Sequence, residues 1–364
     1  MPIDRLIGWD LGGAHLKLAQ VDLEGRLLDV SQLPCPIWKG LEFLDRALDL
    51  AGQAIRADRP LHAVTMTAEL ADIFHDRRQG VQFLIERFSS HLRNGEIRIF
   101  AGRAGLLPIA EITGHIMEIA SANWLASASF AAQRCERGIL VDIGSTTTDL
   151  LEFRGGKVCY RGYSDAERLH SGELVYTGVV RTPVMVIVNR VPFEGEWQTL
   201  AAEHFATMAD VYQLTGRFAG FTPPVAFETA DRAGQGPQDC ARRLARMLGR
   251  DLESADLVQW QGLAHYIAHA HQGMIRESLA RILSRGAETQ DLPLIGAGIG
   301  RFLVRELAAQ VGCQFIDFSE LVDGNPELRN YAAVCAPATA LAYLARSYWN
   351  TLKDATSPDS RAPV

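Results

Sequence analysis

Apolar and polar residues alternate in three short runs near the start of the chain, a pattern that predicts a meander of three β-strands. The runs read LIGWD, HLKLAQVD and RLLDVSQL, and their turns fall at Gly12-Gly13 and Glu24-Gly25. Helical spacing follows over residues 41–55, around 70–88 and over 110–133, with the short strand-like runs HAVTM and IRIF between these segments. Strands alternating with helices indicate an α/β domain.

The same meander returns about 130 residues later. GILVDIG, TTTDLLEF and KVCYRGY are three strand-like runs, joined at Gly144-Ser145 and Gly155-Gly156. In both copies an Asp-x-Gly sequence closes the first strand, and a second strand follows the turn. The repeat predicts two related domains.

The predicted boundaries follow from this repeat. The first domain spans residues 1–135 and also includes a C-terminal helix over 336–350. The second domain spans 136–335, with an insertion over 164–236 and two helices between 239 and 285. The polar residues 352–364 read as a flexible tail.

Charge and composition narrow the classes of function. A net charge of −7 without a basic block argues against a nucleic-acid partner, and no apolar run approaches the length of a membrane helix. The six cysteines form no Cys-x-x-Cys pair, which disfavours both a disulfide framework and a thiolate zinc site. Without a recognisable signal peptide, we expect a cytoplasmic protein; dimerisation stays open.

The two Asp-x-Gly turns are candidate phosphate sites. Glycines in a tight turn let backbone amides approach an anion, and nearby hydroxyls donate further hydrogen bonds. An aspartate at the strand end can hold Mg²⁺. The predicted phosphate-binding residues are Gly12, Gly13, Lys17, Gly144, Ser145, Thr146, Thr147 and Thr148, and the predicted metal ligands are Asp10 and Asp142. The alternatives are that the aspartates only cap their turns and that strand propensity explains one of the threonines.

A third glycine turn adds to this pattern. The strand-like run ending at Ile295 is followed by Gly296 and Gly298 and then by a helix, whose N-terminus attracts anions. Position 301 is Arg, so the spacing departs from a dinucleotide fingerprint. We therefore add Gly296 and Gly298 to the predicted phosphate site.

These three turns together resemble the superfamily of actin, sugar kinases and Hsp70. The stretches SANWLASA, YTGVVRTPV, FATMADVYQLTG and APATALAYL are more narrowly similar to the hydantoinase/oxoprolinase branch. Within it the chain resembles members associated with tetrahydromethanopterin-linked one-carbon metabolism, including those that make methanofuran. The resemblance implies an α/β, two-domain actin/hexokinase/Hsp70-like fold of duplicated ribonuclease H-like domains, with a ligand cleft between the domains.

The resemblance also implies an activity. It suggests a transferase that joins an aminomethylfuran-methyl diphosphate to the phenol oxygen of a tyramine- or tyrosine-type acceptor and releases pyrophosphate. The implied partners are these two small molecules and Mg²⁺. An ATP-dependent small-molecule kinase or a hydantoinase/oxoprolinase-type amidohydrolase is the alternative, and a non-enzymatic actin-like or Hsp70-like scaffold is a third.

The first hairpin departs from the pattern of a phosphotransferase, which carries hydroxyl residues there. Strand alternation places His15 and Lys17 on one face and Leu16 on the other. Lys17 would neutralise phosphate charge, and Glu69 or His15 would act as the base. Substrate contacts are predicted for Asn123, Asp149, Arg181 and Asp210. His265, His269 and His271 are close in sequence, but lack the His-Glu-x-x-His pattern of a zinc site.

Overall fold

The computed structural model describes residues 3–92, 94–219, 227–286 and 292–356. The chain forms two compact units, each of which is described by itself. Unit 1 comprises Met1–Gly138, Phe153–Cys159 and Asp317–Val364, and unit 2 comprises Ile139–Glu152 and Tyr160–Ile316. Residues 317–335, which the sequence assigned to the second domain, are grouped with unit 1.

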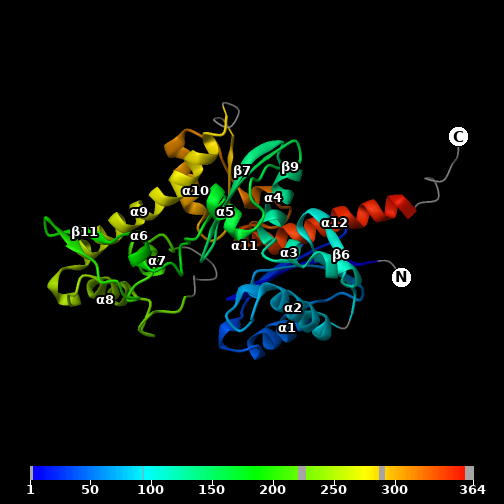
Figure 1. Ribbon diagram of the computed structural model, residues 1–364, viewed down its shortest axis with the longest axis horizontal. Helices are drawn as coiled ribbons and strands as arrows, with labels where there is room; N and C mark the ends of the chain where they lie inside the picture. The colour runs from blue at the N-terminus through cyan, green and yellow to red at the C-terminus, as the bar shows by residue number, and fades with distance from the viewer. Residues whose placement is uncertain (1–2, 93, 220–226, 287–291, 357–364) are drawn as a thin grey trace. The chain divides into compact units, whose positions relative to one another are not determined.

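Unit 1 is built on a mixed sheet with the strand order β3-β2-β1-β4-β5-β6. Figure 1 draws the N-terminal part of this unit in blue to cyan. The predicted meander is present, because β1 pairs antiparallel with β2 and β2 with β3. The next two strands run parallel to β1, so their carboxyl ends lie at one edge. The strands are β1 (Arg5–Leu11), β2 (His15–Val21), β3 (Leu27–Pro34), β4 (Pro60–Met66), β5 (Glu96–Phe100) and β6 (Leu106–Pro108).

Helices cover both faces of this sheet, which explains why β1 is buried from Leu6 to Leu11. On one face Trp9 is fully buried and packs edge-on against Phe88 of α2, with ring centroids 5.2 Å apart. On the other face α12 lies on β1, β2 and β4. A Cβ at Gly8 would lie 2.0 Å from the carbonyl oxygen of Ala338, so only glycine lets this helix approach so closely. The helices of unit 1 are α1 (Glu42–Ala54), α2 (Arg77–His91), α3 (Ile116–Ile119), α4 (Asn123–Arg134), α11 (Pro326–Val334) and α12 (Ala336–Thr356).

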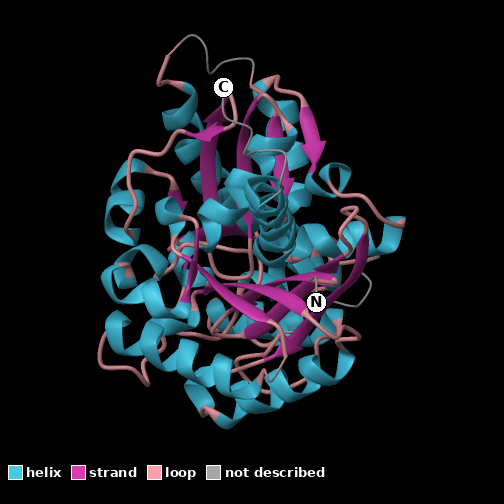
Figure 2. Cartoon of the chain, turned by 90° about the vertical axis from the view of Figure 1, so that its right-hand side faces the viewer, coloured by secondary structure: helices cyan, strands magenta, loops and turns pink. Residues whose placement is uncertain are grey.

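Unit 2 repeats this strand order. Its sheet runs β10-β8-β7-β13-β14, with the short β9 also paired to β8, and β13 lies parallel to β7 as β4 does to β1. Figure 2 colours the strands of both sheets magenta and the helices beside them cyan. The repeat predicted from the two meanders is therefore present in the topology. The strands of this sheet are β7 (Arg137–Ile143), β8 (Thr148–Arg154), β9 (Lys157–Val158), β10 (Leu174–Val175), β13 (Leu294–Ala297) and β14 (Phe315–Asp317), and the residues of β9 are grouped with unit 1.

The predicted insertion carries a small hairpin and short helices of unit 2. β11 pairs with β12, and the ring of Phe193 on β11 stacks on Trp260 of the long helix α9, with centroids 4.9 Å apart. The two helices predicted between 239 and 285 are α8 and α9. The additional elements of unit 2 are α5 (Asp165–Ser171), α6 (Val184–Ile187), β11 (Arg190–Phe193), β12 (Glu196–Thr199), α7 (Met208–Leu214), α8 (Pro237–Met247), α9 (Leu257–Leu283) and α10 (Arg301–Val311).

Two sequence predictions were wrong in detail. The long helix expected over residues 110–133 is broken into 3-10 turns, α3 and α4, because Ser121 has a φ of 51°, which no α-helix accommodates. The tail expected over 352–364 begins as helix, since α12 continues to Thr356, and the rest of it lies outside the described residues. Among the residues with described positions, no helix combines the length and hydrophobicity needed to cross a membrane.

Candidate functional site

The first hairpin of unit 1 places a buried carboxylate opposite a lysine. Asp10 on β1 pairs with Lys17 on β2, and Asp10 Oδ2 lies 3.9 Å from Lys17 Nζ. Only 4% of Asp10 is exposed, and its Oδ1 is buried without a hydrogen bond among the described residues. Burial raises the pKa of the Asp10 carboxyl, and Lys17 lowers it in part. Thr65 lies beside Asp10 on β4, and its buried Oγ1 likewise has no hydrogen bond within the described part of the chain.

The turn of this hairpin is closed tightly by its own backbone. The Gly12 N–H donates to the His15 carbonyl oxygen over 3.1 Å, and a Cβ at Gly12 would lie 2.7 Å from that oxygen. The Gly13 carbonyl accepts from the Ile37 N–H. Leu16 is fully buried whereas His15 and Lys17 are half-buried, which confirms the predicted alternation of faces.

Glu69 lies just beyond the carboxyl end of β4. It belongs to the 3-10 helix η2 (Ala68–Leu70), and the Thr67 N–H donates to the Leu11 carbonyl oxygen, which ties this end to the end of β1. The Glu69 side chain is 1% exposed, and its Oε1 accepts a hydrogen bond of 2.7 Å from the hydroxyl of Ser121. The predicted base is thus buried at the sheet edge where Asp10 lies. Asn123, half-buried, begins α4 two residues after Ser121.

The donor set at Asp10 fits Mg²⁺. Magnesium takes oxygen ligands and is commonly held by one or two carboxylates together with water and substrate phosphates. The carboxylate of Asp10 and the hydroxyl of Thr65 each present a buried oxygen without a hydrogen bond among the described residues. Groups of three or more His, Cys, Asp or Glu suited to a metal do not occur within the described residues. A metal at Asp10 would therefore depend on phosphate and water oxygens for its remaining ligands.

In unit 2, the hydroxyl-rich turn after β7 is held by backbone hydrogen bonds. The Gly144 N–H donates to the Thr147 carbonyl oxygen over 2.9 Å, closing the turn. Ser145, Thr146 and Thr147 are half-buried, and the hydroxyls of Ser145 and Thr146 are 3.4 Å apart. Three half-exposed hydroxyl residues at one tight turn match the donor pattern predicted for phosphate.

A second segment of unit 2, residues 177–182, buttresses this turn. The Val179 N–H donates to the Gly144 carbonyl oxygen, and the Arg181 N–H donates to that of Ser145 over 2.8 Å. A Cβ at Gly178 would lie 2.6 Å from the Gly144 carbonyl oxygen, so the two stretches of backbone touch. Arg181, for which the sequence predicted a substrate contact, is exposed beside the turn.

Thr148 does not fit the predicted phosphate role. It is fully buried at the start of β8, and its hydroxyl donates to the Thr177 carbonyl oxygen over 2.8 Å. The side chain therefore joins the turn to the buttressing segment. It is the threonine that strand alternation turns inward.

Of the two glycines predicted for the third turn, the structure places only Gly298 at the turn. Gly298 has a φ of 78°, and a Cβ there would lie 2.4 Å from Oδ1 of Asp142, so this turn packs against the predicted metal ligand at the end of β7. The Gly300 N–H donates to the Ile143 carbonyl oxygen over 2.8 Å. Gly296 instead lies buried inside β13 against the ring of Phe315. The strand extends two residues further than predicted, which removes Gly296 from the turn.

Two of the predicted substrate contacts are engaged in ion pairs inside unit 2. Asp149 pairs with the buried Arg168; burial raises the pKa of its carboxyl and Arg168 lowers it in part. Asp210 pairs with Arg243 at 2.7 Å, and both side chains are at most 1% exposed. Asp210 also accepts from the Thr207 N–H at the start of α7. Its carboxylate therefore stabilises the packing of α7 on α8.

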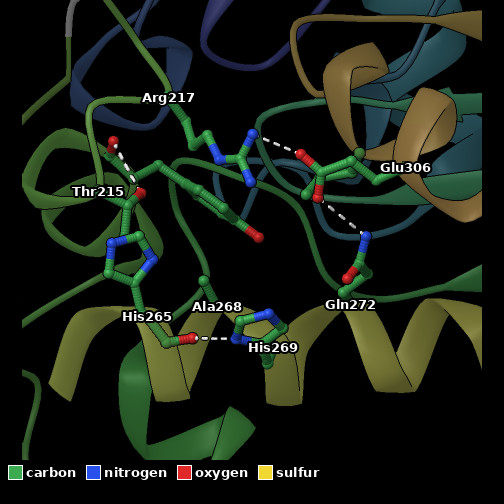
Figure 3. Close-up of a pocket in the computed structure, with 9 residues that line it drawn as sticks. Thr215, Arg217, His265, Ala268, His269, Gln272 and Glu306 are labelled. Atoms are coloured by element: carbon green, nitrogen blue, oxygen red, sulfur yellow. Dashed lines mark hydrogen bonds and ion pairs between the residues drawn. The ribbon is translucent and has the colours of Figure 1, made fainter. Parts of the chain in front are cut away.

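A separate recess of unit 2 lies along α9 (Figure 3). Its polar groups bond to one another: Glu306 pairs with Arg217 and accepts from Gln272 Nε2 over 3.2 Å. His269 Nδ1 hydrogen-bonds to the backbone oxygen of His265 over 2.8 Å, so these two histidines do not converge on one point. These polar groups of the recess therefore form hydrogen bonds and an ion pair with one another.

Sequence reasoning missed three residues of the candidate site. Gly178 lies in the stretch YTGVVRTPV, which the sequence analysis singled out for its family resemblance. Its contact with the turn was missed because it joins two backbone segments 34 residues apart in sequence. Ser121 also lay in a quoted motif, within a stretch predicted as continuous helix. Thr65 carried no signal, since a threonine in a strand is ordinary.

The amino-acid sequence matches a known family and resembles known proteins. A family model described as Hydantoinase/oxoprolinase matches residues 61–343, well over half of the chain. A (4-{4-[2-(gamma-L-glutamylamino)ethyl]phenoxymethyl}furan-2-yl)methanamine synthase from Methanocaldococcus jannaschii is 29% identical over 294 residues, covering 80% of this chain and 86% of that protein. A synthase of the same name from Methanococcus vannielii is 31% identical over 132 residues, 35% of this chain and 58% of that protein.

A solved structure supports the fold. The nucleotide-free structure of acetone carboxylase aligns with 93% of this chain and 70% of that chain, with a TM-score of 0.56 and 9% identity. A ROK family glucokinase from Streptomyces griseus, in complex with glucose and AMPPNP, aligns with 94% of this chain and 99% of that chain, with a TM-score of 0.47 and 14% identity. The first alignment, together with the repeated strand order, confirms the predicted α/β fold.

Proposed function

The chain belongs to the hydantoinase/oxoprolinase family, with the two-domain α/β fold of actin, sugar kinases and Hsp70, and from this premise we propose that it is a carbon–oxygen bond-forming transferase. The proposed reaction joins an aminomethylfuran-methyl diphosphate to the phenol oxygen of a tyramine- or tyrosine-type acceptor. The observation that carries the proposal is the similarity to the Methanocaldococcus jannaschii synthase over most of both chains. The name of that synthase describes a phenoxymethyl-furan, which contains this ether. The product would serve a methanofuran-type cofactor of tetrahydromethanopterin-linked one-carbon metabolism.

The proposed chemistry balances as a substitution at carbon. The bond between the furan-methyl carbon and the bridging oxygen breaks, and its electron pair leaves with pyrophosphate. The phenol oxygen forms the new bond to that carbon, and its proton passes to a base of the protein. The furan oxygen stabilises positive charge at the methyl carbon, so the protein has to stabilise the departing diphosphate and keep water away.

We assign the diphosphate to the hydroxyl turn of unit 2. Ser145, Thr146 and Thr147 are half-buried at a turn whose backbone is fixed by residues 177–182, so the donors are preorganised. The exposed Arg181 would add a charge-assisted contact to the same anion, or to the acceptor's carboxylate. Gly298 lets the third turn approach Asp142 at the base of this site.

In unit 1, Asp10 and Thr65 would hold Mg²⁺, which when bound neutralises phosphate charge. Lys17 would add a further positive charge beside Asp10 in the same unit. Its neighbour His15, on the same face, remains the second candidate for the base. Glu69 is the first candidate, because it is a buried carboxylate at the same sheet edge.

The experiment that tests the proposal compares two incubations of the full chain with Mg²⁺. One receives the furan-methyl diphosphate and the phenol; the other receives ATP and the phenol. We expect pyrophosphate and the ether in equal amounts from the first and no ADP from the second. ADP released in response to a small substrate, without ether formation, would replace the transferase with the ATP-dependent kinase or amidohydrolase.

A further inference from the structure

We infer that Ser121 is a positioning residue that fixes the Glu69 carboxylate in the orientation needed to accept the phenol proton. The inference rests on the proposed function and extends it to a residue without a previous role. Its basis is the hydrogen bond of 2.7 Å from Ser121 Oγ to Glu69 Oε1, between residues 52 positions apart. Both residues are buried, so water competes little for this bond.

The backbone of Ser121 is strained, and strain of this kind can mark a functional position. Its φ of 51° lies in the left-handed region, which costs a residue with a Cβ about 1–2 kcal/mol. The other non-glycine residues of positive φ in the described part of the chain, Glu194 and Arg232, are exposed. Glycine at position 121 would remove the strain but also the hydroxyl. A strained buried serine is therefore best explained by what its hydroxyl does.

The main chain of Glu69 is fixed independently of Ser121. It lies in η2, against α2, where a Cβ at Gly80 would be 2.5 Å from the Glu69 carbonyl oxygen and 2.8 Å from its Cα. This packing holds the backbone, and the Ser121 hydroxyl holds one end of the side chain. A base needs such constraint, because proton transfer requires hydrogen-bond geometry within a few tenths of an ångström.

A purely structural reading is that Ser121 only satisfies a buried carboxylate. The two readings differ in what loss of the hydroxyl changes. A structural role predicts lower stability with unchanged kinetics of the folded fraction. A positioning role predicts a lower kcat, an unchanged KM for the diphosphate, and a shifted pH profile.

The test compares Ser121→Gly, Ser121→Ala and Ser121→Asn with the wild-type chain in the ether-forming reaction. Glycine relieves the backbone strain, alanine keeps it, and asparagine tolerates the left-handed region while offering a donor. For Ser121→Gly we expect kcat to fall about 100-fold with the KM for the diphosphate within about 2-fold. The acidic limb of the pH profile should move to higher pH, because the lost hydrogen bond stabilises the ionised carboxylate. Ser121→Asn should recover part of the rate.

The matched control is Ser89→Ala, which removes the hydroxyl of a half-buried serine whose hydrogen bond to the Glu86 carbonyl oxygen is exposed. It should leave kcat and the pH profile unchanged. Wild-type kcat and an unshifted pH profile in folded Ser121→Gly would overturn the inference while leaving the transferase intact. Absence of ether with the wild-type chain would overturn the proposed function, and the inference with it.

Discussion

The contact between Gly178 and the hydroxyl turn gives the sharpest prediction about the phosphate site. A Cβ at position 178 would lie 2.6 Å from the Gly144 carbonyl oxygen, the Ser145 carbonyl carbon and the Thr146 nitrogen. All three are backbone atoms, so no rotamer change can make room. Gly178 cannot retreat easily, because its N–H donates to Thr182 Oγ1 over 2.8 Å. Gly178→Ala should therefore displace the backbone of the hydroxyl turn.

The size of the effect follows from these distances. Ordinary contacts of a Cβ begin near 3.4 Å, so the turn has to move by about 0.8 Å. Overpacking of this kind costs about 1–3 kcal/mol of folding stability. A displacement approaching 1 Å in a positioning element costs about 100-fold in rate. We expect Gly178→Ala to fold, to lose about 1–3 kcal/mol, and to lose about 100-fold in kcat/KM.

Three assays measure this prediction: thermal unfolding for stability, turnover for kcat/KM, and calorimetry for pyrophosphate affinity. The matched control is Gly262→Ala on the exposed side of α9, where an added Cβ meets no atom within 4 Å. It should gain about 0.5–1 kcal/mol from helix propensity and keep its activity. Folded Gly178→Ala with wild-type turnover and pyrophosphate affinity would refute the assignment of phosphate to this turn.

Three further predictions address other parts of the chain. Gly8→Ala should cost about 3 kcal/mol in denaturant unfolding, because its Cβ would meet α12 at 2.0 Å; an unchanged midpoint would contradict this packing. Burial lowers the pKa of His271 from 6.5 to about 4, so the unfolded state binds more protons between these values, and the contribution of His271 to stability should fall by about 3 kcal/mol as pH drops from 6.5 to 4. Burial lowers the pKa of His62 to about 4 as well, so His62 adds to the same slope. His271→Phe should flatten that slope, and an equally steep slope would refute the cause. Asp10→Asn should abolish turnover, because asparagine lacks the negative charge proposed to hold Mg²⁺; turnover at the wild-type rate would count against it.

The sequence predicted those features that depend on local pattern. Both hairpins, their repeated order, and the opposite faces of Leu16 and Lys17 follow from the alternation of residues with period two. The placement of Glu69 at the end of a strand also followed, because β4 was visible as a short apolar run.

What the sequence could not predict depends on contacts between distant segments. Asp210 was predicted as a substrate contact, and only the position of Arg243 on another helix shows why it is buried. A Gly-x-Gly pattern does not reveal that its first glycine lies inside a strand, as Gly296 does. The break at Ser121 arises in a sequence with good helical spacing, where a tertiary hydrogen bond accompanies the left-handed residue.

The fate of one oxygen atom tests the central proposal most directly. The furan-methyl diphosphate is prepared with ¹⁸O at the bridging position between the methyl carbon and phosphorus, and both products are analysed by mass spectrometry. Attack of the phenol oxygen on carbon predicts that all of the label appears in pyrophosphate and none in the ether. Label retained on the furan-methyl carbon, or a phosphorylated phenol in place of the ether, would contradict the account.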